Sequence, residues 1–383
     1  MTIYIIARGY PSVNDPVWGC FEKDQAEALA SLGHKVVILA VDTRLRMFRM
    51  PLTTQEITAN GVSVYNIIAI PHAFLFFLSE SNKNALSTIL LNIVYKRAIA
   101  THGIPDVLYS HYLYNTQCAT FLKKKYNIPL IGIEHWSHLG KMPIPKEIQK
   151  IAVNIYPQLD LLISVSTALR KNIQEQIGTD SIVIPNMLGH EFLHKTKNEH
   201  RNNKIKKIIT TGRLVEGKKF DLLIRALSNI NTPYDLNIIG NGPIKNKLEL
   251  LIQQLNLTEK IHLLGHKNKD ELVCLLEQSD LFVLPSQSET FGVSYIEALA
   301  CGLPIIATDC GGPKDFVTKE NGLLIPTNNL EALKNAIEFM IEHINDYDKV
   351  AIAEDCKKRF SPKMIAKELT LIFEKIINKN KNN

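Results

Sequence analysis

The stretch SETFGVSYIEALACGLPIIATDCGGPKDF runs from Ser288 to Phe316. It places Glu289 in a polar segment and, with seven residues between them, Glu297 in an Ala- and Leu-rich helical run. Backbone N–H groups at the start of such a helix can bind phosphate, and carboxylates can accept hydrogen bonds from hydroxyl groups. The stretch therefore indicates a ligand that carries both kinds of group, such as a sugar nucleotide.

Short hydrophobic runs recur on both sides of this stretch. They are near-continuous rather than alternating, which is typical of parallel strands that are covered on both faces. Helical patterns lie between most of them, and such alternation predicts βαβ units. We expect strands at residues 2–7, 35–41, 62–70, 106–111, 130–135, 161–166, 182–186, 206–212, 234–240, 261–265, 281–286, 304–309 and 322–326.

The chain has 383 residues, which is long for one hydrophobic core. Two sets of βαβ units predict an α/β protein with two doubly wound domains. The polar, Asn- and Lys-rich segment 186–204 is typical of a linker. We expect an amino-terminal domain over residues 1–188 and a carboxyl-terminal domain over residues 189–361, with a helix at about 362–378 packing back on the first.

Composition excludes several classes of protein. The net charge of +6 is mild and spread along the chain, so no nucleic acid partner is expected. The six cysteines form no C-x-x-C pair, which argues against a zinc or thioredoxin-type site. No apolar run reaches the roughly 20 residues of a membrane helix, and no signal peptide precedes the first strand. A reducing cytoplasm is the expected compartment.

Basic residues and glycines follow two of the expected strands. Arg213 and Lys218 leave one strand end, directly after Gly212, and the turn Gly240-Asn241-Gly242 follows the next strand. Ligands gather at the carboxyl ends of parallel strands, where two cations can converge on a diphosphate and glycines allow close backbone approach. Taken singly, each motif could also be an ordinary surface turn.

The stretch from Ser288 contributes a third loop at the carboxyl ends of the expected strands. Phe291, Gly292 and Val293 stand where the strand LFVLPS turns into the helix VSYIEALA, so their backbone can face a phosphate. Two carboxylates beside a diphosphate would repel it. The pair Arg213 and Lys218 is therefore expected nearby.

Together these motifs resemble the retaining GT-B glycosyltransferases of family 4, the group 1 glycosyltransferases. The resemblance is carried by GRLVEGK (212–218), GNGP (240–243), LLGH (263–266) and the two glutamates at 289 and 297. It implies two Rossmann-like domains that face a central cleft. Lys219 departs from the pattern, because the family usually has glycine there.

The resemblance also implies an activity. A sugar would move from a nucleotide diphosphate sugar, with uridine as the default base, to an acceptor hydroxyl with retention at the anomeric carbon. Glu289 would orient the sugar, Glu297 would bind the ribose, and the base would lie near Gly265 and His266. The basic pair would hold the leaving diphosphate without a divalent metal.

The amino-terminal half resembles the acceptor domain of the family more loosely. A glycine after the first strand would face the donor diphosphate, and Gly19 is the candidate. A functional histidine at a strand end would correspond to His135, with His111 and His138 as further candidates. The resemblance implies closure of the two domains over the donor and a place in bacterial cell-surface polysaccharide or glycolipid synthesis.

Three segments invite other interpretations. Asp346-Tyr347-Asp348 has the form of a D-x-D metal motif, but its helical surroundings favour a solvated helix end. The runs 44–50 and 74–78 mix basic and apolar residues. They fit either inward packing or contact with an anionic membrane that carries a lipid-linked acceptor.

Other functions fit parts of the pattern. A phosphorylase or a sugar-nucleotide epimerase could share the fold, and a non-catalytic sugar-nucleotide-binding subunit could keep the same motifs. An NAD(P)-dependent oxidoreductase is disfavoured because no G-x-G-x-x-G follows the first strand. The sequence leaves the donor sugar, the acceptor and the oligomeric state open.

Overall fold

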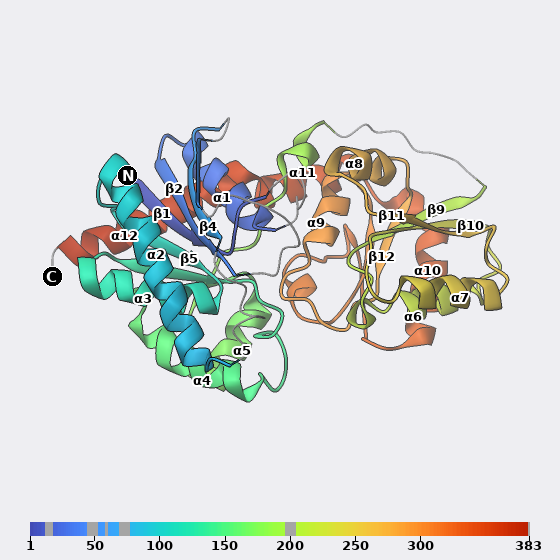
Figure 1. Ribbon diagram of the computed structural model, residues 1–383. Coiled ribbons are helices and arrows are strands. Elements are labelled where there is room, and N and C mark those ends of the chain that lie inside the picture. The colour runs from blue at the N-terminus through green and yellow to red at the C-terminus, as the bar shows by residue number, and fades with distance from the viewer. Residues whose placement is uncertain (12–17, 44–52, 58–59, 69–76, 196–203, 382–383) are drawn as a thin grey trace. The chain divides into compact units, whose positions relative to one another are not determined.

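The computed structural model describes residues 1–11, 18–43, 53–57, 60–68, 77–195 and 204–381 (Figure 1). It divides into two compact units. The amino-terminal unit consists of Met1–Val165, Leu169–Met187 and Pro362–Asn383, and the carboxyl-terminal unit consists of Ser166–Ala168 and Leu188–Ser361. The main crossing lies between Met187 and Leu188, next to the boundary expected at residues 188 and 189.

The amino-terminal unit is built on an eight-stranded sheet with the order β3-β4-β2-β1-β5-β6-β7-β8. The strands are β1 (Thr2–Ala7), β2 (Lys35–Asp42), β3 (Thr53–Ile57), β4 (Ser63–Ile68), β5 (Val107–His111), β6 (Leu130–Glu134), β7 (Leu161–Ser164) and β8 (Ile182–Val183). The helices are α1 (Cys20–Ser31), α2 (Glu80–His102), α3 (Leu113–Tyr126), α4 (Lys146–Ile155), α5 (Thr167–Ile177) and α12 (Pro362–Lys381).

One edge of this sheet differs from the all-parallel expectation. Strand β3 pairs antiparallel with β4, whereas every other pair in the sheet is parallel. Only residues 58–62 connect the two strands. A connection this short permits an antiparallel pair, because a parallel pair needs a crossover of about a dozen residues or more.

The core of the amino-terminal unit lies between the central strands and the helices α2 and α3. Tyr4, Val37, Tyr95, Leu108 and Leu122 are among the buried side chains that meet there. The 23-residue helix α2 was not among the helical patterns expected from the sequence. On another part of the unit, α12 lies against α1, and the Phe373 ring packs 5.0 Å from the Tyr109 ring.

The carboxyl-terminal unit is built on a parallel six-stranded sheet with the order β11-β10-β9-β12-β13-β14. Its strands are β9 (Lys206–Thr211), β10 (Tyr234–Ile239), β11 (Ile261–Gly265), β12 (Leu281–Leu284), β13 (Ile305–Thr308) and β14 (Gly322–Ile325). Its helices are α6 (Phe220–Leu227), α7 (Lys245–Gln254), α8 (Lys269–Glu277), α9 (Val293–Ala300), α10 (Leu330–Glu342) and α11 (Lys349–Phe360). Two Rossmann-like α/β units confirm the predicted fold class.

The strand order of the second sheet explains where a ligand site can form. The chain winds outward from β9 in one direction to β10 and β11, and then returns to place β12 on the other side of β9. A reversal of this kind separates the loops that follow the two central strands and leaves room for a ligand at their carboxyl ends.

Some sequence-based interpretations fall outside the described residues. These are the basic and apolar run 44–50 and residues 74–76 of the second such run. Among the described residues, none of the helices combines the length and the hydropathy that a membrane crossing requires.

Candidate active site

The carboxyl edge of the second sheet gathers most of the residues selected from the sequence. Gly212 and Arg213 follow β9, Gly240 and Gly242 follow β10, and Gly265 and His266 stand at the end of β11. Glu289 and the start of α9 follow β12. The four strands are neighbours in the sheet, so their loops share one edge.

Backbone hydrogen bonds join these loops to one another. The N–H of Gly212 donates to the carbonyl of Ile239 (3.0 Å), and the N–H of Leu214 donates to Asn241 (3.0 Å). The N–H of Gly240 in turn donates to Gly265 (2.9 Å). The loops after β9, β10 and β11 therefore form one connected surface whose shape depends on the backbone.

Gly240 shows why this surface needs glycine. Its φ of 140° lies where side chains are disfavoured, and a Cβ atom there would stand 1.9 Å from the carbonyl oxygen of Gly212. A displaced carbonyl would disturb the neighbouring loop as well. Glycine is thus required by the contact between two loops, in addition to the turn itself.

Lys218 and Glu289 meet at this edge although they lie far apart in sequence. The Nζ atom of Lys218 is 2.5 Å from Oε1 of Glu289, and the Ser286 hydroxyl donates to the same oxygen at 2.7 Å. The two side chains are 22% and 11% exposed, so the pair is mostly withdrawn from solvent. The N–H of Gln287 donates to the carbonyl of Gly217 (2.8 Å) and ties the two loops together.

The backbone of Glu289 is fixed by the turn that follows β13. Its N–H donates to the carbonyl of Cys310 (3.1 Å), and its carbonyl accepts from Gly312 (2.9 Å). Burial raises the pKa of the neighbouring Cys310 thiol to about 12, so this thiol is protonated at neutral pH. The backbone of Glu289 is therefore fixed on both sides, and its carboxylate is held through Oε1 by Lys218 and Ser286.

At the start of α9, the backbone and not the side chain of Phe291 is available to a ligand. Gly292 is the N-cap with a φ of 103°, and Val293 is the first helical residue. The Phe291 ring is 1% exposed and packs against Phe316 and Phe360. Phe291 can consequently offer a ligand only its backbone, while the N–H groups of Val293 and Ser294 have no acceptor within the helix.

The remaining carboxyl-terminal candidates lie nearer to solvent. Arg213 and His266 are exposed, and Glu297 is partly exposed in the second turn of α9. An exposed guanidinium beside the paired Lys218 leaves positive charge available for an anion. A carboxylate one turn into the helix can accept hydrogen bonds from hydroxyl groups.

Gly19 is the N-cap of α1 in the amino-terminal unit, with a φ of 79°. A Cβ atom at this position would lie 2.4 Å from the carbonyl oxygen of Gly9. The end of β1 and the start of α1 therefore approach closely. This approach brings the side chains that follow β1 against the first turn of α1.

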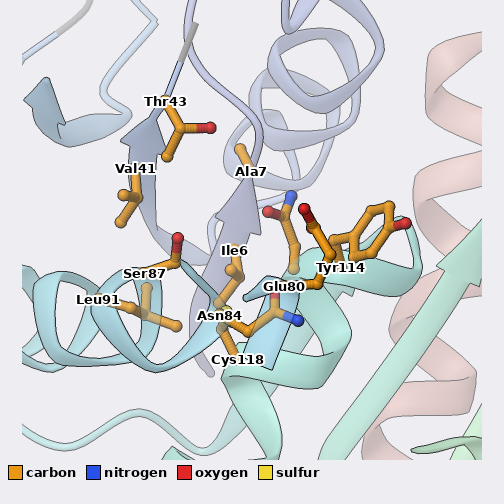
Figure 2. Close-up of a pocket in the computed structure, with 11 residues that line it drawn as sticks. Ile6, Ala7, Val41, Thr43, Glu80, Asn84, Ser87, Leu91, Tyr114 and Cys118 are labelled. Atoms are coloured by element: carbon orange, nitrogen blue, oxygen red, sulfur yellow. The ribbon is translucent and has the colours of Figure 1, made fainter. Parts of the chain in front are cut away.

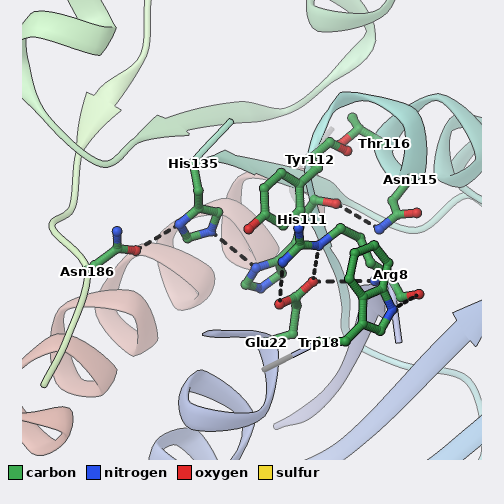
Figure 3. A network of polar contacts seen from close by, with 9 residues as sticks. All are labelled: Arg8, Trp18, Glu22, His111, Tyr112, Asn115, Thr116, His135 and Asn186. Atoms are coloured by element: carbon green, nitrogen blue, oxygen red, sulfur yellow. Dashed lines mark hydrogen bonds and ion pairs between the residues drawn. The ribbon is translucent and has the colours of Figure 1, made fainter. Parts of the chain in front are cut away.

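Arg8 is the centre of the polar contacts that result (Figure 3). Its Nε donates to Oε1 of the fully buried Glu22 at 2.9 Å. Its guanidinium lies 3.7 Å from the centroid of the Tyr112 ring and 4.8 Å from that of Trp18. Burial acts to lower the pKa of Arg8, but the Glu22 carboxylate outweighs it and raises the pKa, so the cation is retained.

Tyr112 adopts a backbone conformation that is uncommon for a large side chain. Its φ is 68°, directly after β5 and before α3. Positive φ costs roughly 1–2 kcal/mol for a residue of this kind. This conformation places the Tyr112 ring against the Arg8 guanidinium at the end of β5.

His135 and His111 form a stacked pair beside these residues (Figure 3). The rings lie 5.3 Å apart and 11° from parallel, and Nε2 of His135 is 3.2 Å from Nδ1 of His111. Nδ1 of His135 is 2.8 Å from Oδ1 of Asn186. Burial lowers the pKa of His135 to about 4 and that of His111 well below its usual range, so both rings are neutral at pH 7.

The neighbouring Glu134 is a buried carboxyl group. Its Oε1 accepts a hydrogen bond from the Tyr156 hydroxyl at 2.9 Å. Burial raises the pKa of Glu134 to about 8, and this effect exceeds the opposing hydrogen bonds. The end of β6 thus carries two ionisable groups that are both neutral at pH 7.

Comparison with protein families gives two matches that together span most of the chain. Residues 23–191 match the family described as "Glycosyltransferase Family 4", and residues 193–354 match "Glycosyl transferases group 1". An uncharacterized glycosyltransferase of Methanocaldococcus jannaschii is 31% identical over 270 residues, which cover 70% of this chain and 73% of that protein.

The chain is a group 1 glycosyltransferase of family 4.

A second relative of the glycosyltransferase is a Bacillus subtilis protein named for teichuronic acid biosynthesis. It is 25% identical over 365 residues, with 88% of each chain covered. Among solved structures, the HepE protein of Anabaena in complex with UDP and glucose superposes with a TM-score of 0.74 at 19% identity, covering 98% of this chain and 100% of that one. This likeness supports the GT-B fold.

Lys219 of the glycosyltransferase has a backbone conformation that favours glycine. Lys219 has φ 56° and ψ 38°, in the left-handed region that glycine adopts most easily. A lysine therefore stands in a conformation that suits the glycine usual in the family. Lys218, one position earlier, keeps its contact with Glu289.

The D-x-D segment has a structural role in the glycosyltransferase. Asp348 is the N-cap of α11 and accepts hydrogen bonds from the N–H groups of Val350 and Ala351. Within the described part of the chain, no group of three or more His, Cys, Asp or Glu side chains could hold a metal ion.

Much of the amino-terminal group of contacts was not predicted from the sequence. Gly19 and His135 were selected there, whereas Arg8, Trp18, Glu22, Tyr112 and Asn186 were not. One signal was present, because Arg8 follows a strand end just as Arg213 does. His138 lies apart from the Arg8 contacts, with its ring 4.7 Å from the Trp136 ring.

Proposed function

We propose that the protein transfers a sugar from a UDP-sugar to an acceptor hydroxyl, with retention at the anomeric carbon, in the synthesis of a bacterial cell-surface polysaccharide or glycolipid. The observation that carries this proposal is the contact of Lys218 with Glu289 at the strand edge. The UDP complex of the HepE structure supports the choice of nucleotide, and the Bacillus subtilis relative supports the pathway.

The diphosphate would be bound by charge and by backbone. Arg213 is exposed and can form a bidentate contact with phosphate, while Lys218 supplies a second positive charge. The first N–H groups of α9, at Gly292 and Val293, would bind further phosphate oxygens. These groups are all positive or polar, and the backbone N–H groups are fixed before the charge develops.

The two glutamates would divide the hydroxyl groups of the donor. Glu289 would bind the transferred sugar, because its carboxylate is held in place beside Lys218. Glu297 would bind the ribose from the second turn of α9. The base would lie near Gly265 and His266 at the end of β11.

His135 is the proposed partner of the transferred sugar in the amino-terminal unit, with Gly19 as the proposed partner of the diphosphate. Because burial lowers the pKa of His135 to about 4, its imidazole is neutral and would contact the sugar without adding positive charge. Asn186 and His111 fix the ring plane.

The reaction proposed here needs no covalent enzyme intermediate. The bond from the anomeric carbon to the UDP oxygen breaks, and a bond from the same carbon to the acceptor oxygen forms on the same face. The acceptor proton passes to the departing phosphate. Because Arg213 and Lys218 take up the negative charge, we also propose that transfer is independent of divalent metal, so EDTA should leave the rate unchanged.

A panel of nucleotide sugars tests the proposal. UDP and UDP-sugars should bind to the purified protein in calorimetric titrations, and one of them should release UDP when an acceptor is present. Product NMR should show the anomeric configuration of the donor. Failure of UDP and of every UDP-sugar to bind would overturn the proposed function, as would an inverted product.

We further propose that the protein binds reversibly to an anionic membrane. The helices α2 and α3 pack against each other, and neither contains an Asp or Glu after Glu80. After Asn82 their exposed residues are mostly apolar or basic, and they include Ile89, Ile93, Phe121, Lys96, Arg97, Lys124 and Lys125. Apolar side chains flanked by cations are typical of surfaces that bind acidic lipid.

Vesicle sedimentation tests the membrane proposal separately. The protein should pellet with vesicles of phosphatidylglycerol and phosphatidylcholine at low salt, and it should remain in solution with phosphatidylcholine alone. Lys124→Glu with Lys125→Glu should weaken sedimentation, whereas Lys245→Glu with Lys247→Glu in the carboxyl-terminal unit should not. Equal sedimentation with both kinds of vesicle would overturn the proposal.

A further inference from the structure

A cavity of about 260 Å³ lies in the amino-terminal unit (Figure 2). It is bounded by the carboxyl ends of β1 and β2 and by the amino-terminal halves of α2 and α3. Ligands of α/β proteins bind at this end of the strands. None of the residues selected from the sequence lines it.

One end of the cavity is apolar and buried. It is formed by Ile6, Leu91 and Cys118, which are 2%, 2% and 7% exposed, and by Val41, with the side chain of Ser87 beside them (Figure 2). Burial raises the pKa of the Cys118 thiol, so this side chain is an uncharged, weakly polar group. A methyl group is the natural occupant of such a surface.

The other end of the cavity is polar and open. Glu80, Asn84 and Asn115 provide one carboxylate and two amides, and the ring of Tyr114 is 40% exposed beside them. The amide nitrogen of Asn115 donates to the carbonyl of His111 at 2.9 Å, which fixes the orientation of this side chain. Amides and a carboxylate beside an aromatic ring can receive the hydroxyl groups and one face of a sugar.

The charge of the lining limits the ligand further. Of the described residues that form the cavity wall, none is Lys, Arg or His, and the single ionisable carboxylate is Glu80. Glu80 is itself paired with Lys83 at 2.7 Å, so a phosphate or a uronate would meet no unpaired cation among the described wall residues. The cavity is also smaller than the roughly 300–1,000 Å³ of pockets for drug-sized ligands, and it suits one sugar ring.

We propose that this cavity binds a neutral, methyl-bearing sugar residue of the acceptor, either an N-acetylamino sugar or a 6-deoxy sugar. The methyl group occupies the end formed by Ile6, Leu91 and Cys118, and the hydroxyl groups face Glu80 and Asn84. The identification of this sugar as the acceptor rests on the proposed transferase function. Binding of the sugar to the cavity can be tested without it.

Free monosaccharides test the ligand class in the absence of any donor. Saturation-transfer NMR on the purified protein would compare N-acetylglucosamine, 6-deoxyglucose, glucose and glucuronate, together with the matching galactose series. A methyl-bearing sugar should bind roughly tenfold more tightly than the parent hexose, with its methyl protons saturated most strongly. Equal binding of glucose or of a uronate would overturn the proposal.

A filling substitution tests the location. Ser87 lines the cavity from α2, and Ser87→Leu should reduce binding of the methyl-bearing sugar at least tenfold. Ala85, two positions earlier on the same helix, is exposed and does not line the cavity, so Ala85→Leu is the matched control. Cys118→Leu fills the same space from α3 and serves as a second variant.

The outcomes separate this proposal from the proposed function. Thermal unfolding first shows which variants are folded, and unchanged sugar binding in folded Ser87→Leu and Cys118→Leu proteins would overturn the assignment. If neither variant folds, the monosaccharide series on the unmodified protein decides alone. Failure to bind UDP would overturn the transferase function only, whereas UDP-sugar transfer without any preference for a methyl-bearing acceptor would overturn the cavity assignment.

Discussion

The two candidate regions of the molecule are built in different ways. At the edge of β9, β10 and β11, the loops are joined by backbone hydrogen bonds, and glycines such as Gly240 allow the contact. After β1, β5 and β6, the contacts are made by large side chains, with Arg8 between Glu22 and Tyr112. The first region is shaped mainly by backbone and the second mainly by side chains.

This difference determines how each region responds to change. A backbone contact fails when any side chain is added at the crossing point, whatever its chemistry. A side-chain contact fails when one partner is removed and the other is left buried without its counterion. The predictions below use substitutions that distinguish the two cases.

The largest loss of stability is expected for Gly240→Ala. The new Cβ atom would lie 1.9 Å from the Gly212 carbonyl in a backbone conformation that alanine disfavours. Strain and overpacking together should cost about 4 kcal/mol of unfolding free energy. Gly217→Ala, where no atom lies within 4 Å of the added Cβ, should change stability by less than about 0.5 kcal/mol in the same denaturant titration. Similar values for both variants would contradict the backbone explanation.

A somewhat smaller loss is expected for Arg8→Met in the amino-terminal unit. Glu22 is fully buried and would be left without its cation, while Arg8 itself is 27% exposed. The cost should be about 3 kcal/mol, at the lower end for a broken buried pair. The double variant Arg8→Met with Glu22→Met should recover most of this loss in chemical denaturation. Additive losses in the double variant would show that the pair is not the source.

Much of the backbone region could be predicted from sequence, because its signals are local. Gly212 and Gly240 stand directly after hydrophobic runs, Lys218 and Gly242 follow in the same loops, and the parallel fold places those strand ends together. Charge predicted only that Arg213 and Lys218 lie near the two glutamates, and the structure adds the direct contact of Lys218 with Glu289. The contact of Ser286 with Glu289 was not predicted, since a serine near a strand end is common.

The side-chain region could be predicted only in part. His135 and Gly19 were selected because a family resemblance points to them, whereas Glu22 and Asn186 are ordinary residues of a helix and a loop. Glu22 contacts Arg8, and Asn186 contacts His135. These contacts form only because the fold brings together side chains from five separate segments of the chain. The antiparallel β3 was missed for a related reason, because a short polar strand at an edge leaves no hydrophobic run.

A pH-dependent change of stability is expected from Glu134. Its pKa is raised from 4.5 to about 8, so the folded state keeps a proton that the unfolded state loses, and stability falls as the pH rises through this range. The pKa of His135 is lowered from 6.5 to about 4, so below pH 6.5 this residue makes stability rise with pH and opposes the effect of Glu134. Between pH 6.5 and 8 the loss should reach about 2 kcal/mol. Glu134→Gln should abolish it in thermal unfolding, and an unchanged slope in that variant would refute the assignment.

The smallest effect is expected for Lys219→Gly. Removal of a side chain from a left-handed residue should stabilise the protein by about 1 kcal/mol, partly offset by the greater freedom of glycine in the unfolded chain. The midpoint of thermal unfolding should rise by roughly 2 °C. Lys219→Ala keeps the disfavoured conformation and serves as the control. A gain of the same size in both variants would mean that the lysine side chain, and not its φ, is responsible.

The most direct test of the proposed donor site compares two adjacent lysines. Lys218 touches Glu289, whereas Lys219 follows it in the turn. With the UDP-sugar identified by the binding panel, Lys218→Met should lower kcat/KM for sugar transfer by about 100- to 1,000-fold. Lys219→Met should stay within about twofold of the unmodified enzyme. Full activity in Lys218→Met, or equal losses in both variants, would contradict the role of the Lys218 and Glu289 pair in holding the donor.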